Sequence, residues 1–180
     1  MLSLRHSPFW SYLSATQKDL IREGDYLFNI IAQNHRHSFK DYSFLVFPYA
    51  KAYEGYLKQL FLDAGFISYE DYISDHYRLG KCLSPNLAYK LGEQSLYLQI
   101  RQTAGEDLAR QIWNTWRLGR NQIFHYYPHN IRAISFFHAE LIIDQIAKTM
   151  ESAYRLLKLN PKKRHINNSG IRHSIYLNQE

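Results

Sequence analysis

Cysteine, glycine and proline are all scarce in this chain of 180 residues. The one cysteine, Cys82, excludes an intramolecular disulfide and any zinc site built from several cysteines. No run of about 18 apolar residues occurs, so the sequence predicts no membrane-spanning helix. The first ten residues, Met1 to Trp10, also lack a long apolar run, and we therefore expect no signal peptide and a soluble cytoplasmic protein.

Aromatic and basic side chains are abundant instead. Apolar residues make up 46% of the chain, which at this length suits a single globular domain. Tyrosine is the main excess, with 15 residues, and its apolar ring with a polar tip suits cores, interfaces and surfaces that contact nucleobases. The formal charge of +6 favours a polyanionic partner, either nucleic acid or an acidic protein, although a modest positive charge is also common without such a partner.

Apolar residues recur at helical spacing through most of the chain, which predicts an all-α fold. We divide the chain into one helical domain, residues 1–160, and a basic C-terminal tail, residues 161–180, which we expect to be mobile. Thr16 could cap the first helix, and a Tyr-rich irregular region is expected over residues 68–81. The expected helices cover about residues 14–34, 44–64, 86–98, 105–127 and 131–159.

Candidate functional residues concentrate between Arg117 and Pro128, in the segment RLGRNQIFHYYP. At 100° per residue, Asn121 and His125 lie one above the other, on the side opposite the apolar stripe of this predicted helix. Asn121 could then hydrogen-bond one ring nitrogen of His125 and fix its tautomer. Arg120 lies about 140° from His125 around the helix axis. The two side chains therefore reach one ligand only if the long stem of Arg120, the end of the helix or a second subunit brings them together.

The same predicted helix has a second apolar side, formed by Trp113, Leu118 and Phe124. A helix with apolar residues on two sides needs a second partner surface. A two-fold homodimer would supply that surface and would bring two copies of Arg120 and His125 together.

An arginine and a histidine suit RNA cleavage, because RNA carries its own nucleophile in the 2′-OH. Histidine can take the 2′-OH proton, and a fixed guanidinium can stabilise the charge that grows on the phosphorane, without a metal. The spacing alone is not specific, since the chain contains a second match in Arg132 and His138. The first match is favoured because Asn121 follows its arginine, whereas an alanine follows Arg132.

The run Arg120-Asn121-Gln-Ile-Phe-His125 resembles the motif of the HEPN superfamily: arginine, a polar residue, three variable residues and histidine. The segment FPYAKAYEGYLK, residues 47–58, is similar to the preceding helix in the HEPN domain of RNase LS-type toxins, and the two resemblances together span residues 14–159.

This resemblance implies a dimeric HEPN-type bundle of four to six helices with a composite active site. It also implies a metal-independent endoribonuclease, without a cofactor, that leaves a cyclic phosphate. By this resemblance Arg120 and His125 are catalytic and Asn121 orients them. The partners implied are RNA, a second copy of the chain, and a protein antitoxin or inhibitor within a toxin–antitoxin or antiphage system.

Two further interpretations stay open. His125-Tyr126-Tyr127 also fits HEPN toxins paired with a nucleotidyltransferase antitoxin, in which the tyrosine two residues after the histidine, here Tyr127, is modified. The chain could instead be a HEPN-like module that binds RNA or protein without catalysis. Lys51 and Glu54 are secondary site candidates, because their spacing places them on one helix face, either near the active site or in an ordinary ion-pair row.

Overall fold

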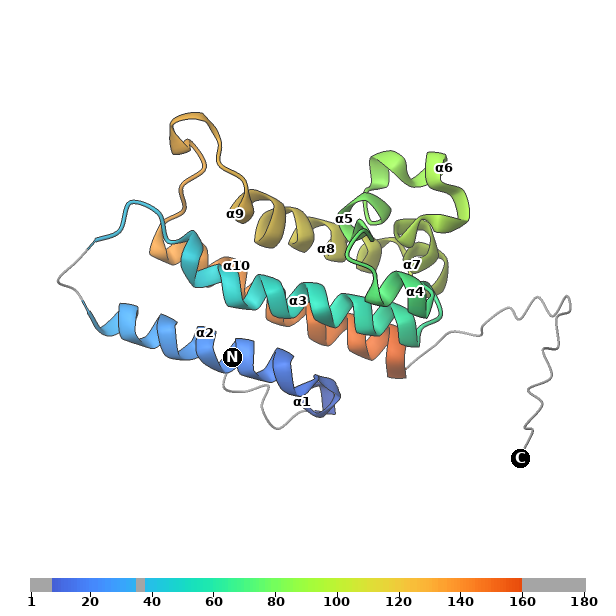
Figure 1. Cartoon of the computed structure of the whole chain (residues 1–180), viewed down its shortest axis with the longest axis horizontal. Coiled ribbons are helices and arrows are strands. Elements are labelled where there is room, and N and C mark those ends of the chain that lie inside the picture. Colours follow the sequence, from blue (N-terminus) through green and yellow to red (C-terminus); the bar gives the residue numbers. More distant parts are fainter. Residues whose placement is uncertain (1–7, 35–37, 160–180) are drawn as a thin grey trace, which may run out of the picture.

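The computed structural model of the chain describes residues 8–34 and 38–159 (Figure 1). Within those ranges every regular element is helical and none is a strand, which confirms the predicted all-α class. Among the described helices, none combines the length and apolar character needed to cross a bilayer. The predicted tail, residues 161–180, lies outside the described residues.

The N-terminal part consists of α1 (Pro8–Tyr12), α2 (Ala15–Gln33) and α3 (Ser43–Asp63). Helix α2 begins with a capping box in which the Ser14 side chain accepts from the Gln17 amide and the Gln17 side chain accepts from the Ser14 amide. The cap is therefore Ser14 and not the predicted Thr16. Helix α3 ends as predicted before Gly65, which adopts a positive φ of 72°.

Helix α3 is the centre of the fold, with α2 on one side and the helix that begins with α8 on the other (Figure 1). Three of its tyrosines, Tyr49, Tyr53 and Tyr56, are buried. The Tyr53 hydroxyl donates to the Ile112 carbonyl at 3.2 Å, and the Tyr56 hydroxyl donates to the Met150 carbonyl at 2.7 Å. Burial raises the pKa of both phenols well above the ordinary value, so they remain neutral donors. Part of the tyrosine excess therefore ties α3 to the helices beside it.

The segment between α3 and α8 departs most from prediction. In place of one helix over residues 86–98, the chain breaks at Gly92, which has a φ of 53°, and restarts where the Ser95 side chain accepts from the Leu98 amide. The described part thus contains more helical segments than the four to six expected, because several are about one turn long. These segments are α4 (Tyr69–Ile73), α5 (Leu79–Cys82), η2 (Pro85–Leu87), α6 (Ala88–Leu91), η3 (Gly92–Gln94) and α7 (Leu96–Ala104).

The C-terminal half contains two long helical runs. The first is continuous through α8 (Glu106–Trp116), η4 (Arg117–Asn121) and α9 (Gln122–Phe124), and the second through α10 (Phe136–Ala153) and η6 (Tyr154–Leu159). The second begins at Phe136, later than the predicted start near residue 131, because Ser135 caps it and accepts from the His138 amide. Between the runs lies the short turn η5 (Pro128–Asn130).

A buried polar pair joins the two long runs. Thr115 on α8 and Thr149 on α10 are buried, and their hydroxyl oxygens lie 2.8 Å apart. Because a buried hydroxyl without a partner is costly, this pair favours one relative placement of α8 and α10. The placement of α8 then determines where η4 lies.

Candidate functional site

Arg120 lies on η4, a π-helical turn between α8 and α9. The Gln122 amide donates to the Arg117 carbonyl five residues earlier, so the turn carries one residue more than an α-helical turn. Gly119 packs directly against α10: a Cβ at this position would lie 3.0 Å from Ile146 Cδ1. The bare backbone of Gly119 therefore lets η4 approach α10 closely. Turns of this kind occur frequently at functional sites.

A carboxylate and two aromatic rings hold the Arg120 side chain. Its Nε lies 3.4 Å from Glu54 Oε2 on α3. Its guanidinium carbon lies 5.6 Å from the ring centroid of Trp116 and 5.1 Å from that of Phe124, distances at which a cation and a ring attract. The Phe124 ring is stacked on Phe47 of α3 at 4.6 Å, so it too is fixed. Arg120 is thus oriented, while its side chain remains 31% exposed.

The predicted contact between Asn121 and His125 does not form in this chain. Helix α9 ends at Phe124, and His125 is extended, with φ −108° and ψ 129°. The prediction that His125 lies above Asn121 on one helix is therefore wrong. The π turn changes the helical register, and the helix ends before His125. His125 is exposed, and no hydrogen bond joins it to Asn121 in residues 8–34 and 38–159.

The predicted second apolar side of this helix is covered in part by the chain itself. Trp113 packs against the core, and Phe124 packs on Phe47. Leu118 remains half-buried and Phe47 is 45% exposed, which leaves some apolar surface uncovered in the described residues.

The three secondary site candidates, Lys51, Glu54 and Tyr127, differ in what they contact. Glu54 contacts Arg120 on another helix, so its partner lies outside the row of charged residues on α3. Lys51 is exposed and forms no ion pair within the described residues. Tyr127 is half-buried, and the Arg132 guanidinium carbon lies 3.9 Å from its ring centroid.

Sequence reasoning missed the aromatic surroundings of Arg120. Trp116 and Phe124 lie four residues before and four residues after Arg120, a spacing that places side chains on one helix face. That spacing was a usable signal. Phe47 carried no such signal, because its contact with Phe124 joins segments far apart in the sequence.

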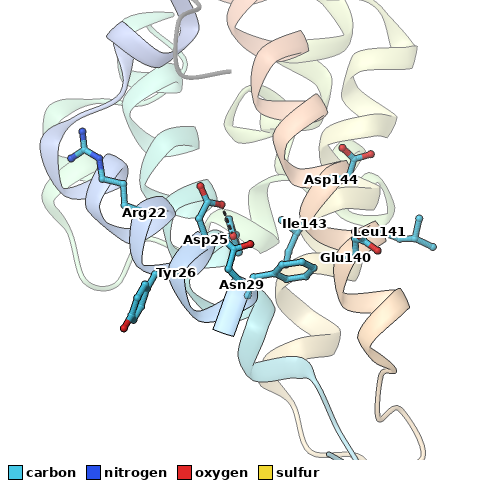
Figure 2. Close-up of a pocket in the computed structure, with 10 residues that line it drawn as sticks. Arg22, Asp25, Tyr26, Asn29, Glu140, Leu141, Ile143 and Asp144 are labelled. Atoms are coloured by element: carbon cyan, nitrogen blue, oxygen red, sulfur yellow. Dashed lines mark hydrogen bonds between the residues drawn. The ribbon is translucent and has the colours of Figure 1, made fainter. Parts of the chain in front are cut away.

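A cavity of about 680 Å³ between α2 and α10 has the wrong charge for the predicted chemistry. Figure 2 shows Asp25 contributed by α2 and Glu140 and Asp144 by α10, with Arg22 at the edge. Asp25 accepts a hydrogen bond from the Tyr49 hydroxyl at 2.7 Å. Three carboxylates repel a phosphodiester, so this cavity does not suit RNA.

The segment that contains η4 is rich in positive charge, unlike this cavity. From residue 108 to residue 139 the sequence contains four arginines and three histidines and no Asp or Glu. Across residues 8–34 and 38–159, no three or more His, Cys, Asp or Glu side chains are grouped where they could hold a metal ion. No protein-family model, curated protein or solved structure matches the chain. Its function must therefore be inferred from the chemistry of these side chains.

Proposed function

We propose that the protein is a metal-independent endoribonuclease of the HEPN type, with Arg120 and His125 as its catalytic pair. The observation that carries this proposal is the state of Arg120. Glu54, Trp116 and Phe124 fix the direction of its guanidinium, which stays partly exposed five residues before an exposed histidine. A fixed, accessible guanidinium is suited to stabilise negative charge on a phosphoryl group.

In the proposed reaction His125 accepts the proton of a ribose 2′-OH. The 2′ oxygen attacks the adjacent phosphorus, the bond to the 5′ oxygen breaks, and that oxygen takes a proton from solvent water, while His125 afterwards returns its proton to solvent. The products are a 2′,3′-cyclic phosphate and a 5′-hydroxyl. Arg120 stabilises the extra negative charge on the phosphoryl oxygens during the attack. Glu54 acts through Arg120 and is a positioning residue.

A homodimer is part of the proposal. The exposed part of Phe47, which is stacked on Phe124, and the half-buried Leu118 offer apolar surface that a second copy could cover. In such a dimer Asn121 would be available to the imidazole of either copy. The proposed setting is a toxin–antitoxin or antiphage system, in which a protein partner restrains the nuclease.

The test is an RNA cleavage assay of the purified protein in excess EDTA, with analysis of the product ends. Wild type is expected to cleave and to leave cyclic phosphates, and His125→Ala and Arg120→Ala are expected to lose cleavage. His138→Ala is the matched control, because His138 belongs to the other Arg–His pair and is also exposed. Intact RNA with uninhibited wild type, or cleavage that persists in His125→Ala, would overturn the proposal. Intact RNA would favour the binding module without catalysis.

A second candidate assigns Tyr127 as a site of modification by a nucleotidyltransferase antitoxin. It is favoured by the Tyr127 hydroxyl, which forms no hydrogen bond within the described part of the chain. Tyr127→Phe is then expected to remain toxic in the presence of the antitoxin. If the antitoxin still neutralises Tyr127→Phe, this candidate fails and the nuclease assignment is unaffected.

A further inference from the structure

The loop after α9, residues 125–135, is held firmly although it projects beyond the helices (Figure 1). We call it the Tyr126 loop. The Asp41 carboxylate accepts from the Asn130 side chain at 3.0 Å and from the Ile134 amide at 3.3 Å. The Ile134 carbonyl accepts from the Tyr42 amide at 2.9 Å. The loop is therefore attached to the segment before α3 at several points.

The backbone within the Tyr126 loop is also fixed. The Asn130 amide donates to the Tyr127 carbonyl at 2.8 Å. His129 and Asn130 both adopt the left-handed conformation, with φ of 58° and 51°. Histidine and asparagine adopt this conformation more readily than most other residues with a side chain, and the hydrogen bonds of Asn130 to Tyr127 and Asp41 help to hold it. The loop presents its side chains in a defined arrangement.

What the loop presents is an aromatic ring without a partner. Tyr126 is 79% exposed and forms no hydrogen bond or ring contact among the described residues. It directly follows His125. Its neighbour Tyr127 is covered on one side by the Arg132 guanidinium, as described above. An exposed ring one residue after the proposed general base, in a loop that also carries a ring covered by a cation, has the groups that bind a base and its phosphate.

The positive charge of the segment around the loop favours a negatively charged polymer as its ligand. The acid-free stretch from residue 108 to residue 139 contains Arg117 and Arg120 before the exposed ring and Arg132 after it. Two carboxylates that contact this region, Asp41 and Glu54, are already engaged with the loop and with Arg120. Cations in the same segment as an exposed aromatic ring complement a strand with a charged backbone and unstacked bases.

We propose that the Tyr126 loop is a base-stacking platform, on which Tyr126 stacks an unpaired nucleobase next to the scissile phosphate and Arg132 binds the following phosphate. This inference rests on the proposed function and narrows its substrate to single-stranded RNA. In a duplex each base is already stacked and paired, so its face is closed to Tyr126. Tyr126 is then a substrate-binding residue that positions the ribose for His125.

The test measures binding separately from cleavage. The probe is a pool of fluorescently labelled single strands of random sequence, about 12 nucleotides long, with 2′-O-methyl riboses that cannot act as the nucleophile. Anisotropy titrations compare wild type with Tyr126→Ala, Tyr126→Phe and Tyr89→Ala. Tyr89 is the matched control, since it is 85% exposed on α6, away from the acid-free stretch. Circular dichroism and thermal melting verify that each variant folds.

Tyr126→Ala is expected to weaken binding roughly 5- to 100-fold, the range associated with loss of one base–aromatic stack. Tyr126→Phe is expected to keep most of the affinity, because it retains the ring, and Tyr89→Ala to bind like wild type. A 2-aminopurine placed in the strand is expected to lose fluorescence on binding wild type and to keep it with Tyr126→Ala. A hairpin duplex of the same length is expected to bind more weakly than the single strand.

Three results would overturn the platform: no binding of the single strands by wild type, unchanged binding by Tyr126→Ala, or an equal loss in Tyr89→Ala. Its failure can be distinguished from failure of the nuclease proposal. If cleavage depends on His125 while Tyr126→Ala binds and cleaves like wild type, only the platform fails. If Tyr126 governs binding but wild type never cleaves, the nuclease fails and the platform describes an RNA-binding module.

Discussion

Replacing Glu54 by glutamine tests how Arg120 is held. The substitution keeps the size of the side chain and one oxygen acceptor but removes the charge opposite the guanidinium. At the observed 3.4 Å, Coulomb's law gives about 5 kcal/mol at an effective dielectric constant of about 20 and about 1 kcal/mol in water. Because both side chains are about one third exposed (31% and 33%), the lower end applies. Measured exposed pairs contribute about 0.2–1 kcal/mol, and we expect Glu54→Gln to cost about 0.5–1 kcal/mol of the free energy of unfolding.

We expect Glu54→Gln to affect the rate of RNA cleavage more than the free energy of unfolding. A guanidinium that loses its carboxylate can rotate away from the phosphate, and misplacement by about 1 Å can cost roughly 100-fold in rate. We therefore expect kcat to fall about 10- to 100-fold in Glu54→Gln with little change in KM, because charge stabilisation is lost in the transition state.

The assays are urea denaturation and steady-state RNA cleavage. Glu23→Gln is the control, since Glu23 is exposed on α2 and forms no ion pair within the described residues. A double-mutant cycle with Arg120→Gln should give a coupling of about 0.5–1 kcal/mol in stability. Zero coupling, together with an unchanged kcat in Glu54→Gln, would refute the positioning role of Glu54.

Three further predictions concern stability. Gly24→Ala places a Cβ 2.8 Å from the Tyr49 ring and should lower the free energy of unfolding by about 1–3 kcal/mol in urea denaturation, whereas Gly55→Ala meets only ordinary contacts and should not lower it. Thr149→Val removes two hydrogen bonds of its buried hydroxyl, one with Thr115 and one from the Gln111 side chain, and should cost about 1–3 kcal/mol in the same measurement; a wild-type value would show that these bonds contribute nothing. Partial burial acts to raise the pKa of Asp41, but hydrogen bonds from neighbouring side chains and amides outweigh it and hold that pKa below its ordinary value of 3.8. This contribution to stability is complete above about pH 4 and is lost as the pH falls below it, so the thermal midpoint of Asp41→Asn should depend less on pH in acid than that of wild type.

Local chemistry made the long helices predictable. The ends of α2 and α3 depend on a capping serine and on Gly65, both of which act on residues a few positions away. The same reasoning chose the wrong cap, because Thr16 and Ser14 have similar side chains and only the reciprocal bond with Gln17 distinguishes them. The late start of α10 was missed although the Ser135 cap is local, because residues 131–134 continue an apolar pattern while their backbone is held in a turn through Asp41 and Asn130.

The sequence supplied some of the residues of the candidate site and little of its geometry. Spacing identified Arg120 and His125 as candidates and left the role of Glu54 open between the site and an ion-pair row. The contact between Glu54 and Arg120 joins residues 66 positions apart, a separation that helical periodicity does not reach. The π turn also depends on packing, because Gly119 is free to approach Ile142 and Ile146 only once α10 is in place. A fixed period of 3.6 therefore placed His125 over Asn121 on a helix that in fact ends at Phe124.

The extra residue in η4 has a consequence for how this segment tolerates changes in length. Removing one residue from Arg117–Asn121 would let ordinary α-helical bonding resume, so the run from Glu106 to Phe124 could survive the deletion. Everything after the deletion would keep about its present face, because a π turn takes up its extra residue within a single turn. The positions within the turn, Arg120 among them, are the ones that would move, in a protein that still folds. A one-residue deletion scan through this helix should accordingly show a position where shape persists and activity is lost.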